Sequence, residues 1–399
     1  MSIWPRRLRY VILILVVTFL LCDVNTSMAQ RTGTAKSTAA AKSTKKEARK
    51  PDAPGTWRFI VSGDSRNCGD VVMPAIAAHS ARYAPSFYWH LGDLRAIYKI
   101  DEDMAAEAGK AGDALTCDVY LKLAWPDFIQ NQIAPFGATP FFVGIGNHER
   151  VPPKTEQRFT AQFADWLDVP VLRQQRLEDD PQDRDPRPYY HWIQDYVDFI
   201  NLDNASDVIS PEQLTWLEGV LKKDAASQTV RSIVVGMHEA LPHSLASNHS
   251  MGDNPQKPEG LVSGEKVYHL LLAFKNTSGK PVYVLASHSH FYMEGIFDHL
   301  SADQRLPGWI VGTAGAVRYP LPKNASPKSK VDTYGYLLAT VHPDGKIEFD
   351  FKQVRESDVP VGVQRRYAPT FVPWCFAHNS LHIDPNVKDA NRCLEPSAH

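Results

Sequence analysis

Five short polar motifs in this sequence each follow an apolar run of the kind that forms a buried strand. The motifs contain Asp, Asn and His, whose oxygen and nitrogen atoms bind divalent metal ions. Side chains at the ends of several strands of one sheet can converge on a single point. The motifs are therefore a candidate metal site, and in chain order they are Gly63-Asp64-Ser65-Arg66, Gly92-Asp93, Gly146-Asn147-His148-Glu149, His238-Glu239 and Ser287-His288-Ser289-His290.

These ligand types suit two divalent cations about 3.5–4 Å apart, which clamp a phosphate group and lower the pKa of a bound water. A bridging carboxylate would serve both ions, with imidazoles and an amide carbonyl around it. The sequence has no Gly-x-Ser-x-Gly motif for a serine nucleophile, and the glycine-rich residues 312–315 lack the Lys-Ser/Thr ending of a phosphate-binding loop. The pattern predicts metal-dependent hydrolysis of phosphate esters, and its candidate ligands are Asp64, Asp93, Asn147, His238, His288 and His290.

The order of the motifs resembles that of the calcineurin-like metallophosphoesterase superfamily, closest to its members of the purple-acid-phosphatase type. The resemblance runs from about residue 57 to about residue 354, and its specific parts are the Gly-Asn-His-Glu element and the last His-x-His. It implies an α/β fold in which two mixed β-sheets pack face to face and are flanked by helices. It also implies a small phosphate-ester substrate and two divalent or mixed-valence metal ions, with Mn, Fe and Zn as the candidates.

The resemblance also implies a role for each motif residue. His148 would stabilise the phosphoryl transition state or protonate the leaving oxygen, and Glu149 would orient the His148 ring from behind. The expected metal ligands divide into Asp64 and His290 for the first ion, Asn147, His238 and His288 for the second, and Asp93 as the bridge between them.

The sequence departs from the family pattern at the first metal. Many members have Asp-x-His in the first motif, whereas this chain has Arg66 at the position of the His. An arginine has no acceptor atom and cannot bind a cation, but its guanidinium suits a bidentate phosphate contact. Purple acid phosphatases place a Tyr three residues after the second-motif Asp, where this chain has Ala96, with Tyr98 as the nearest Tyr. Arg66 and Arg150 are the candidate substrate contacts.

Strand-like runs alternate with helical stretches from Trp57 onward, which agrees with an α/β fold. One helix is well marked, because Ser210 is a suitable N-cap, Pro211 suits the first helical position and Gln213 would complete a capping box. Residues 174–188, 241–260 and 318–332 are predicted to be loops at the rim of the site. His243 and His249 lie in the second of these loops and could line a substrate pocket, but solvent exposure is expected for both. Trp309, Tyr319 and Tyr334 could form a wall of the pocket, but the core is their expected place.

The N-terminal residues have the pattern of a secretory signal peptide. Basic residues precede a short apolar run at 11–22, and Ala29 ends a cleavage site of small residues. We therefore predict a signal peptide at 1–29 and an exported protein, periplasmic or secreted, whose mature chain does not insert stably in a membrane. If the signal is not cleaved, the run would serve as a membrane anchor. Residues 30–55 are predicted to be a flexible basic linker.

The 399-residue chain has a net charge of −2, and residues 1–55 hold ten of its 43 Lys and Arg but three of its 45 Asp and Glu. The remainder is therefore acidic, which argues against a general nucleic-acid-binding protein. We predict a metallophosphoesterase domain at 56–356 and a C-terminal tail, residues 357–399, packed on it.

Four cysteines follow the signal peptide, and three pairings are possible. We favour Cys68–Cys117 with Cys375–Cys393, because the second pair would tie down the Pro-rich tail.

The sequence thus predicts an exported dinuclear phosphoesterase in which a metal-bound hydroxide attacks phosphorus. Two alternatives remain open. If the protein is an enzyme, its preferred substrate could be a diester or a nucleotide instead of a monoester. If it is not an enzyme, it could be a degenerate, non-catalytic binding protein of the same fold, which the presence of Arg66 in the first motif suggests.

Overall fold

The structure is a computed structural model that describes residues 54–246, 249–387 and 391–393. The predicted signal peptide and almost all of the predicted linker lie outside these residues. Among the residues that are described, no helix has both the length and the apolar character needed to cross a membrane.

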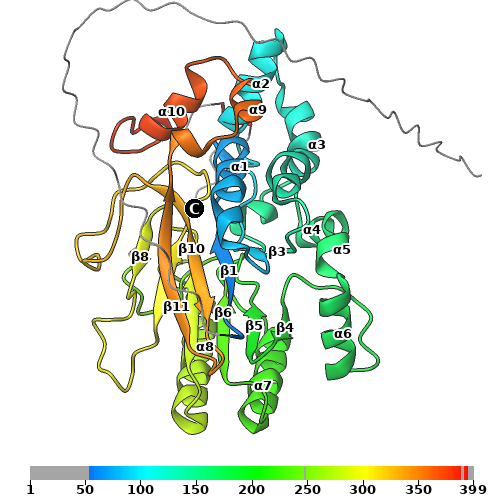
Figure 1. Cartoon of the computed structure of the whole chain (residues 1–399), viewed down its shortest axis with the longest axis vertical. Helices are drawn as coiled ribbons and strands as arrows, with labels where there is room; N and C mark the ends of the chain where they lie inside the picture. Colours follow the sequence, from blue (N-terminus) through cyan, green and yellow to red (C-terminus); the bar gives the residue numbers. More distant parts are fainter. Residues whose placement is uncertain (1–53, 247–248, 388–390, 394–399) are drawn as a thin grey trace, which may run out of the picture. The chain divides into compact units, whose positions relative to one another are not determined.

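The first of two β-sheets has five strands in the order β11-β10-β1-β2-β3 (Figure 1). β1, β2 and β3 run parallel, while β10 pairs antiparallel with both β1 and β11. The sheet is therefore mixed, and its three parallel strands send their carboxyl ends to one edge. The strands are β1 (Trp57–Ser62), β2 (Tyr88–His90), β3 (Phe141–Val143), β10 (Tyr334–Val341) and β11 (Ile347–Val354).

The second sheet has six strands in the order β4-β5-β6-β7-β9-β8. β5, β6, β7 and β9 are parallel, and the antiparallel strands β4 and β8 form its two ends. Two mixed sheets flanked by helices confirm the predicted fold class. The strands are β4 (Tyr190–Gln194), β5 (Val197–Asn201), β6 (Ser232–Gly236), β7 (Val282–Ala286), β8 (Tyr292–Glu294) and β9 (Gly308–Val311).

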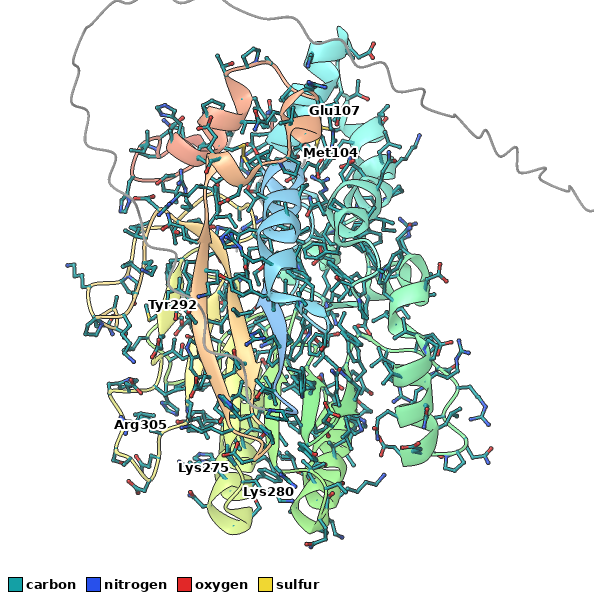
Figure 2. All side chains as sticks on the ribbon, in the orientation of Figure 1. Met104, Glu107, Lys275, Lys280, Tyr292 and Arg305 are labelled. Carbon is teal, nitrogen blue, oxygen red and sulfur yellow. A yellow bond between two sulfur atoms is a disulfide. The ribbon has the colours of Figure 1, made fainter. Side chains whose placement is uncertain are left out.

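Aromatic side chains fill the space between the two sheets. Phe59 of β1 meets Phe199 of β5 edge to face, with ring centroids 5.0 Å apart, and Phe142 of β3 stacks on Trp192 of β4 at 4.0 Å. Figure 2, which draws all described side chains, shows how densely both sheets are covered. Each aromatic side chain of this size buries 150–250 Å², so this layer is a main source of the stability of the fold.

Helices cover the outer faces of both sheets. Neighbouring residues of the second sheet point alternately to the two sides, so that Val234 faces the aromatic layer and Val235 packs with Leu217 and Leu271 of the outer helices. A strand that is buried on both faces is apolar throughout, which explains the continuous runs in the sequence. The longer helices are α1 (Gly69–Ser80), α2 (Glu102–Ala111), α3 (Cys117–Phe128), α6 (Pro170–Asp179), α7 (Pro211–Ala226) and α8 (Pro258–Ser278).

The start of α7 agrees with its sequence signals in part. The Ser210 hydroxyl accepts a hydrogen bond from the backbone amide of Gln213 at 3.2 Å, as an N-cap should. The predicted capping box is wrong, because the Gln213 side chain accepts from the backbone amide of Asp203 and donates to its carbonyl, each at 2.8 Å. Gln213 therefore ties the helix to the loop that follows β5.

Two of the three predicted loops also contain helix. α6 occupies the first part of residues 174–188, and α8 begins within the last part of residues 241–260. Residues 318–332 are irregular, as expected. The short elements of the fold are η1 (Ala81–Tyr83), η2 (Ile129–Ile133), η3 (Ala134–Phe136), η4 (Asn147–Arg150), α4 (Glu156–Gln162), α5 (Ala164–Leu167), η5 (Glu356–Asp358), α9 (Val361–Gln364) and α10 (Phe371–Ala377).

The C-terminal segment contributes to the main core instead of only covering it. Tyr367, Val372 and Cys375 are at most 4% exposed and join the same cluster as the aromatic layer. The side chain of Arg318 donates to the backbone carbonyls of Asn379 and Phe376. In Figure 1, α9 and α10 lie beside α1.

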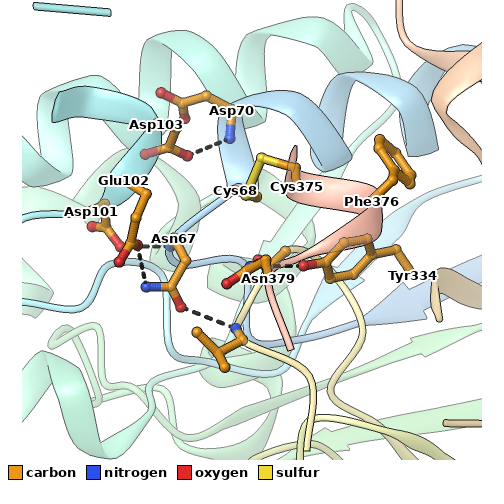
Figure 3. The surroundings of a disulfide bond; sticks show 12 residues. Asn67, Cys68, Asp70, Asp101, Glu102, Asp103, Tyr334, Cys375, Phe376 and Asn379 are labelled. Carbon is orange, nitrogen blue, oxygen red and sulfur yellow. Dashed lines mark hydrogen bonds between the residues drawn. A yellow bond between two sulfur atoms is a disulfide. The ribbon is translucent and has the colours of Figure 1, made fainter. Parts of the chain in front are cut away.

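The favoured disulfide pairing is wrong. Cys68 is bonded to Cys375 (Figure 3), and Cys117 is bonded to Cys393. Both bonds join the C-terminal segment to early parts of the chain, across 307 and 276 residues. The prediction had joined neighbours in sequence, but these cysteines meet because the C-terminal segment folds back over the start of α1. Two disulfides agree with an oxidising, exported environment.

Candidate metal centre

The five motifs lie in loops that follow β1, β2, β3, β6 and β7, so both sheets contribute to one site. The backbone amide of His288 donates to Oδ2 of Asp64 at 2.8 Å, which joins the loop after β7 to the loop after β1. Nε2 of His238, after β6, lies 3.3 Å from Oδ1 of Asp93, after β2. The structure therefore brings together side chains that are more than 200 residues apart.

Three of the six candidate ligands have a left-handed backbone conformation. The φ angle is +59° for Asp64, +59° for Asp93 and +60° for His288. Non-glycine residues adopt this conformation infrequently, and such strain concentrates at functional sites. The turn at His288 also explains how His288 and His290 can face one site, because the two side chains would point to opposite faces if the strand continued. The chain turns directly after β7, and both rings face the site.

Gly146 allows the loop after β3 to lie against Asp93. A Cβ atom at Gly146 would lie 2.3 Å from Oδ1 and 2.4 Å from the backbone nitrogen of Asp93, closer than such atoms can come. The glycine of the Gly-Asn-His-Glu motif is therefore required by contact with a candidate ligand.

Four candidate ligands converge around Nε2 of His238. This atom lies 2.9 Å from Oδ1 of Asn147, 3.0 Å from Nδ1 of His288 and 3.3 Å from Oδ1 of Asp93. Burial and the neighbouring His238 ring lower the pKa of His288 well below its usual value, so its imidazole is neutral. Two imidazoles, an amide oxygen and a carboxylate around one point are a suitable ligand set for a transition-metal dication.

Backbone carbonyls fix the orientation of the histidine rings. Nδ1 of His238 lies 3.0 Å from the carbonyl of Leu91, and Nδ1 of His290 lies 2.6 Å from the carbonyl of Val317. A carbonyl only accepts, so each Nδ1 carries the hydrogen and each Nε2 presents its lone pair to the site. The same arrangement on metal-binding histidines selects the tautomer and increases the basicity of the ligand nitrogen.

The ligands predicted for the first ion also come together, but around a guanidinium. Asp64, Asp93 and His290 offer atoms that lie within 4.8 Å of one another. Nη2 of Arg66 donates to Nε2 of His290 at 2.8 Å, and Nε of Arg66 lies 3.6 Å from Oδ2 of Asp93. Oδ1 of Asp64 and Oδ2 of Asp93 are buried and have no hydrogen-bond donor. The side chain of Arg66 thus occupies the region expected for the first metal.

His148 is held by the same arginine. Its Nδ1 lies 2.6 Å from the carbonyl of Ala96, so Nε2 accepts a hydrogen bond from Nη1 of Arg66. Burial and Arg66 lower the pKa of His148 to about 3. Burial lowers the pKa of Arg66, but Asp93, Asp64 and two nearby tyrosines together outweigh burial and raise it, so the guanidinium is positive and the imidazole neutral.

The expected orienting role of Glu149 is wrong. Its carboxylate accepts hydrogen bonds from the backbone amides of Asp93, Leu94 and Gly146 at 2.9, 3.0 and 2.9 Å. The partner of the His148 ring on that side is the carbonyl of Ala96. Burial and the nearby Asp93 raise the pKa of Glu149 to about 8. Glu149 therefore fastens the loops after β2 and β3 to each other.

Ala96 stands where purple acid phosphatases have a ligand tyrosine, and its side chain has no ligand atom. Ala96 is fully buried and offers its carbonyl to His148. The ring of Tyr98 lies against the ring of His148, with centroids 5.2 Å apart.

A cavity of about 630 Å³ opens beside Asn147 and His288. Its wall carries charged side chains of both signs, including Arg150, Asp253 and Lys257. This is within the usual size of a small-molecule site. Arg150 reaches the cavity, but its Nη2 is bonded to the carboxylates of Glu156 at 2.8 Å and Asp203 at 2.7 Å.

Two aromatic residues from the predicted rim loops pack against candidate ligand histidines. Tyr319 stacks on His290 with ring centroids 4.0 Å apart, and His249 lies 5.2 Å from the ring of His288. His249 is half-buried, so the expected exposure is wrong for it, whereas His243 is exposed and Trp309 and Tyr334 lie in the core, as expected. Neither Tyr319 nor His249 belongs to a periodic pattern or a motif, so only the positions of the two loops pointed to them.

Comparison with known proteins gives matches among solved structures alone. No protein-family model matches the sequence, and no curated protein is similar to it in sequence. The structure is similar to that of purple acid phosphatase PPD1 from yellow lupin (Lupinus luteus) seeds, with a TM-score of 0.52 and 16% identity. That match covers 75% of this chain and 52% of the lupin chain, so this chain spans about half the length of the lupin protein.

Two further structures are more distant. GAP50, the anchor in the inner membrane complex of Plasmodium, matches with a TM-score of 0.46 and 12% identity over 75% of this chain and 84% of its own. PhoD matches with a TM-score of 0.45 and 17% identity over 75% of this chain and 70% of its own. The sheet order, the site at the sheet edge and the similarity to the lupin phosphatase agree: this chain has the calcineurin-like metallophosphoesterase fold.

Proposed function

We propose that this protein is an exported metal-dependent phosphoesterase that hydrolyses small phosphate esters. The observation that carries the proposal is the convergence on Nε2 of His238, where Asn147, His288 and Asp93 all place a ligand atom within 3.3 Å. Four side chains from four separate loops meet here, and two of these residues have strained backbone conformations. Binding of a divalent ion would account for both the convergence and the strain.

The residues around His238 fit such an ion. Two imidazoles, an amide oxygen and a carboxylate face one point, and the backbone carbonyl of Leu91 fixes the ring of His238 from behind. A divalent ion bound there would act as a Lewis acid toward a phosphate oxygen and lower the pKa of a coordinated water. Mn, Fe and Zn all accept this ligand set. The absence of a tyrosine at position 96 argues against a purple Fe(III) centre.

Arg66 and His148 are the residues that we assign to the phosphoryl group. The guanidinium of Arg66 can donate two parallel hydrogen bonds to phosphate oxygens and neutralise charge that develops on them. His148 lies next to it with its Nε2 directed into the site. We propose that a substrate oxygen takes over this Arg66 contact and that His148 then faces the leaving group.

The cavity beside Asn147 and His288 would hold the rest of the ester. Because Glu239 and Asp253 line it together with Lys257 and Arg150, we propose that the organic part of the substrate is polar. Its volume of about 630 Å³ has room for a group larger than a simple alkyl chain. A diester or a nucleotide is therefore the alternative to a monoester.

We also propose export with cleavage after Ala29. Support comes from the signal-peptide pattern, and from two disulfides, which persist in oxidising compartments. Expression in a host with a secretory pathway and mass spectrometry of the intact exported chain would test this. A mature N-terminus at Gln30 is expected, and an uncleaved chain in the membrane fraction would contradict it.

The second candidate function is a non-catalytic binding protein of this fold. The observation that favours it is Arg66, which fills the region where the family pattern has a metal ligand. Such a protein would retain ligand binding in the cavity without turnover.

One assay separates the two functions. Purified protein is incubated with an aryl phosphate monoester and with the matching diester, each with added Mn and with a chelator. Metal-dependent turnover supports the phosphoesterase, and the better substrate identifies the ester class. No turnover with Mn, Zn or Fe contradicts it and favours the binding protein. His148→Ala serves as the internal control, because it should reduce turnover sharply while the metal content stays the same.

A further inference from the structure

We propose that this site holds one divalent ion, bound around His238, and that the guanidinium of Arg66 takes the place of the other ion of the family pattern. The inference rests on the proposed metal site and concerns its composition. It replaces the two ions expected from the sequence with one ion and one fixed organic cation.

A hydrogen bond joins Arg66 to His290. Nδ1 of His290 donates to the carbonyl of Val317, so the single lone pair of the ring is on Nε2. That lone pair accepts from Nη2 of Arg66 at 2.8 Å. A ring nitrogen that accepts this hydrogen bond has no electrons left for a metal ion. Nε2 of His290 is therefore occupied by the hydrogen bond from Arg66.

The carboxylates on this side face the same guanidinium. Oδ2 of Asp93 lies 3.6 Å from Nε of Arg66, and Oδ1 of Asp64 lies 3.2 Å from the His290 nitrogen that Arg66 contacts. Arg66 is 6% exposed and both carboxylates are fully buried. Water cannot screen the charges here, so a dication would be strongly repelled by an arginine a few ångströms away. Arg66 cannot escape this repulsion by losing a proton.

The side of the site around His238 is free of this conflict. Its ligand atoms come from Asp93, Asn147, His238 and His288, and none of them accepts a hydrogen bond from Arg66 among the bonds of the described residues. Asp93 divides its two oxygens, with Oδ1 toward His238 and Oδ2 toward Arg66. The carboxylate that the family pattern uses to bridge two metals here bridges one ion position and one arginine.

This composition changes what the two halves of the site can do. Arg66 can offer positive charge and hydrogen bonds to a phosphate, but it cannot coordinate a water molecule. One dication and one guanidinium against two carboxylates leave a single excess positive charge, which is enough to attract an anionic ester. Only the half around His238 can supply an activated water.

The test is the number of ions per chain. The purified full chain is loaded with Mn(II) and freed of excess metal by gel filtration. Its metal content is then measured by inductively coupled plasma mass spectrometry. We expect one Mn per chain in the wild type and in Arg66→Lys, which retains the cation. We expect two in Arg66→His, which removes the cation and restores the Asp-x-His pattern. Electron paramagnetic resonance should show isolated Mn(II) in the first two and a spin-coupled pair in the third.

Two ions in the wild type, with a spin-coupled spectrum, would overturn the proposal. One ion in both the wild type and Arg66→His would overturn the role given to Arg66. If Arg66→His fails to fold by circular dichroism, Asp64→Asn replaces it. Asp64 belongs to the Arg66 side, so this change should leave one tightly bound Mn, and loss of that ion would contradict the assignment.

The activity assay keeps the two proposals distinguishable. A wild type with one Mn and no turnover of either ester supports the single-ion site and contradicts the proposed function. A wild type that binds two Mn and hydrolyses an ester rapidly supports the proposed function and contradicts the single-ion site.

Discussion

Glu149 accepts a hydrogen bond from the backbone amide of Asp93 at 2.9 Å, so one buried acid holds in place the loop that carries another. The same carboxylate also binds the amides of Leu94 and Gly146. These three amides belong to the loops after β2 and β3. The position of the Asp93 side chain relative to Asn147 therefore depends on an acid that does not itself reach the candidate metal position.

We expect Glu149→Gln to destabilise the fold. A glutamine must direct its NH₂ group at one or more of the three amides, which leaves buried donors unsatisfied at a cost of roughly 1–3 kcal/mol. Urea denaturation would measure this. Glu178→Gln is the matched control, because Glu178 is exposed and bonds only to Gln174 among the contacts described, so its stability should change by less than about 0.5 kcal/mol. Equal effects of the two substitutions would contradict the role of Glu149.

Gly146→Ala should weaken metal binding. The new methyl group would push against Oδ1 and the backbone nitrogen of Asp93 and displace a ligand, and changes of this kind lower metal affinity by roughly 10–100-fold. Isothermal titration with Zn or Mn would show it. Gly109→Ala is the control, since a Cβ there meets nothing within 4 Å and α2 gains about 0.5–1 kcal/mol from the loss of a helical glycine. Unchanged affinity in Gly146→Ala would count against Asp93 as a ligand.

A buried ion cluster far from the metal site should make stability depend on pH. Nδ1 of His191 lies 2.7 Å from Asp198, and Nε2 bonds to Asp179, which also pairs with Lys223. Burial lowers the pKa of His191, but the two carboxylates outweigh it and raise the pKa to about 10. The folded pKa is above the ordinary value of about 6.5, so the stabilisation is complete below about pH 6.5 and is lost as the pH rises to about 10.

His191→Gln tests this dependence. At pH 6 the variant should be roughly 3–5 kcal/mol less stable than the wild type, because it leaves the buried carboxylate of Asp198 without its cation. The difference should shrink toward pH 10, where the wild-type imidazole loses its proton. Parallel denaturation curves at pH 6, 8 and 10 measure it, and a difference that grows with pH would refute the assignment.

The disulfide connectivity can be read from peptides of the unreduced protein. We expect a fragment containing Cys68 linked to one containing Cys375, and a fragment containing Cys117 linked to one containing Cys393. A Cys68–Cys117 fragment would contradict the structure. The double variant Cys68→Ala/Cys375→Ala should lose roughly 2–5 kcal/mol of stability in thermal or urea unfolding.

The motifs and the fold class were predictable from sequence because both depend on local patterns. Strands buried on two faces read as apolar runs, and a polar group directly after such a run lies at a sheet edge. The partners of Cys68 and Glu149 were not predictable in this way. Cys68 meets a segment more than 300 residues away, and the carboxylate of Glu149 is bonded to backbone amides, which have no signature in side-chain sequence.

The same limit applies to the walls of the site. Tyr319 and His249 come from irregular loops whose paths are decided by tertiary contacts, such as the stacking of Tyr319 on His290. For Arg66, the sequence showed which residue stands in the first motif but not what its side chain contacts. Its hydrogen bonds to His290 and His148 depend on how the loops pack around the site.

The bond from Cys68 to Cys375 connects the loop after the first strand to nearly the last helix of the chain (Figure 3). During synthesis, the motif that contains Asp64 emerges first, whereas the cysteine that ties down its loop emerges 307 residues later. A chain that stops between residues 291 and 374 contains every candidate ligand but lacks the partner of Cys68. The disulfide that fixes the loop after β1 can therefore form only once the chain has been made as far as α10.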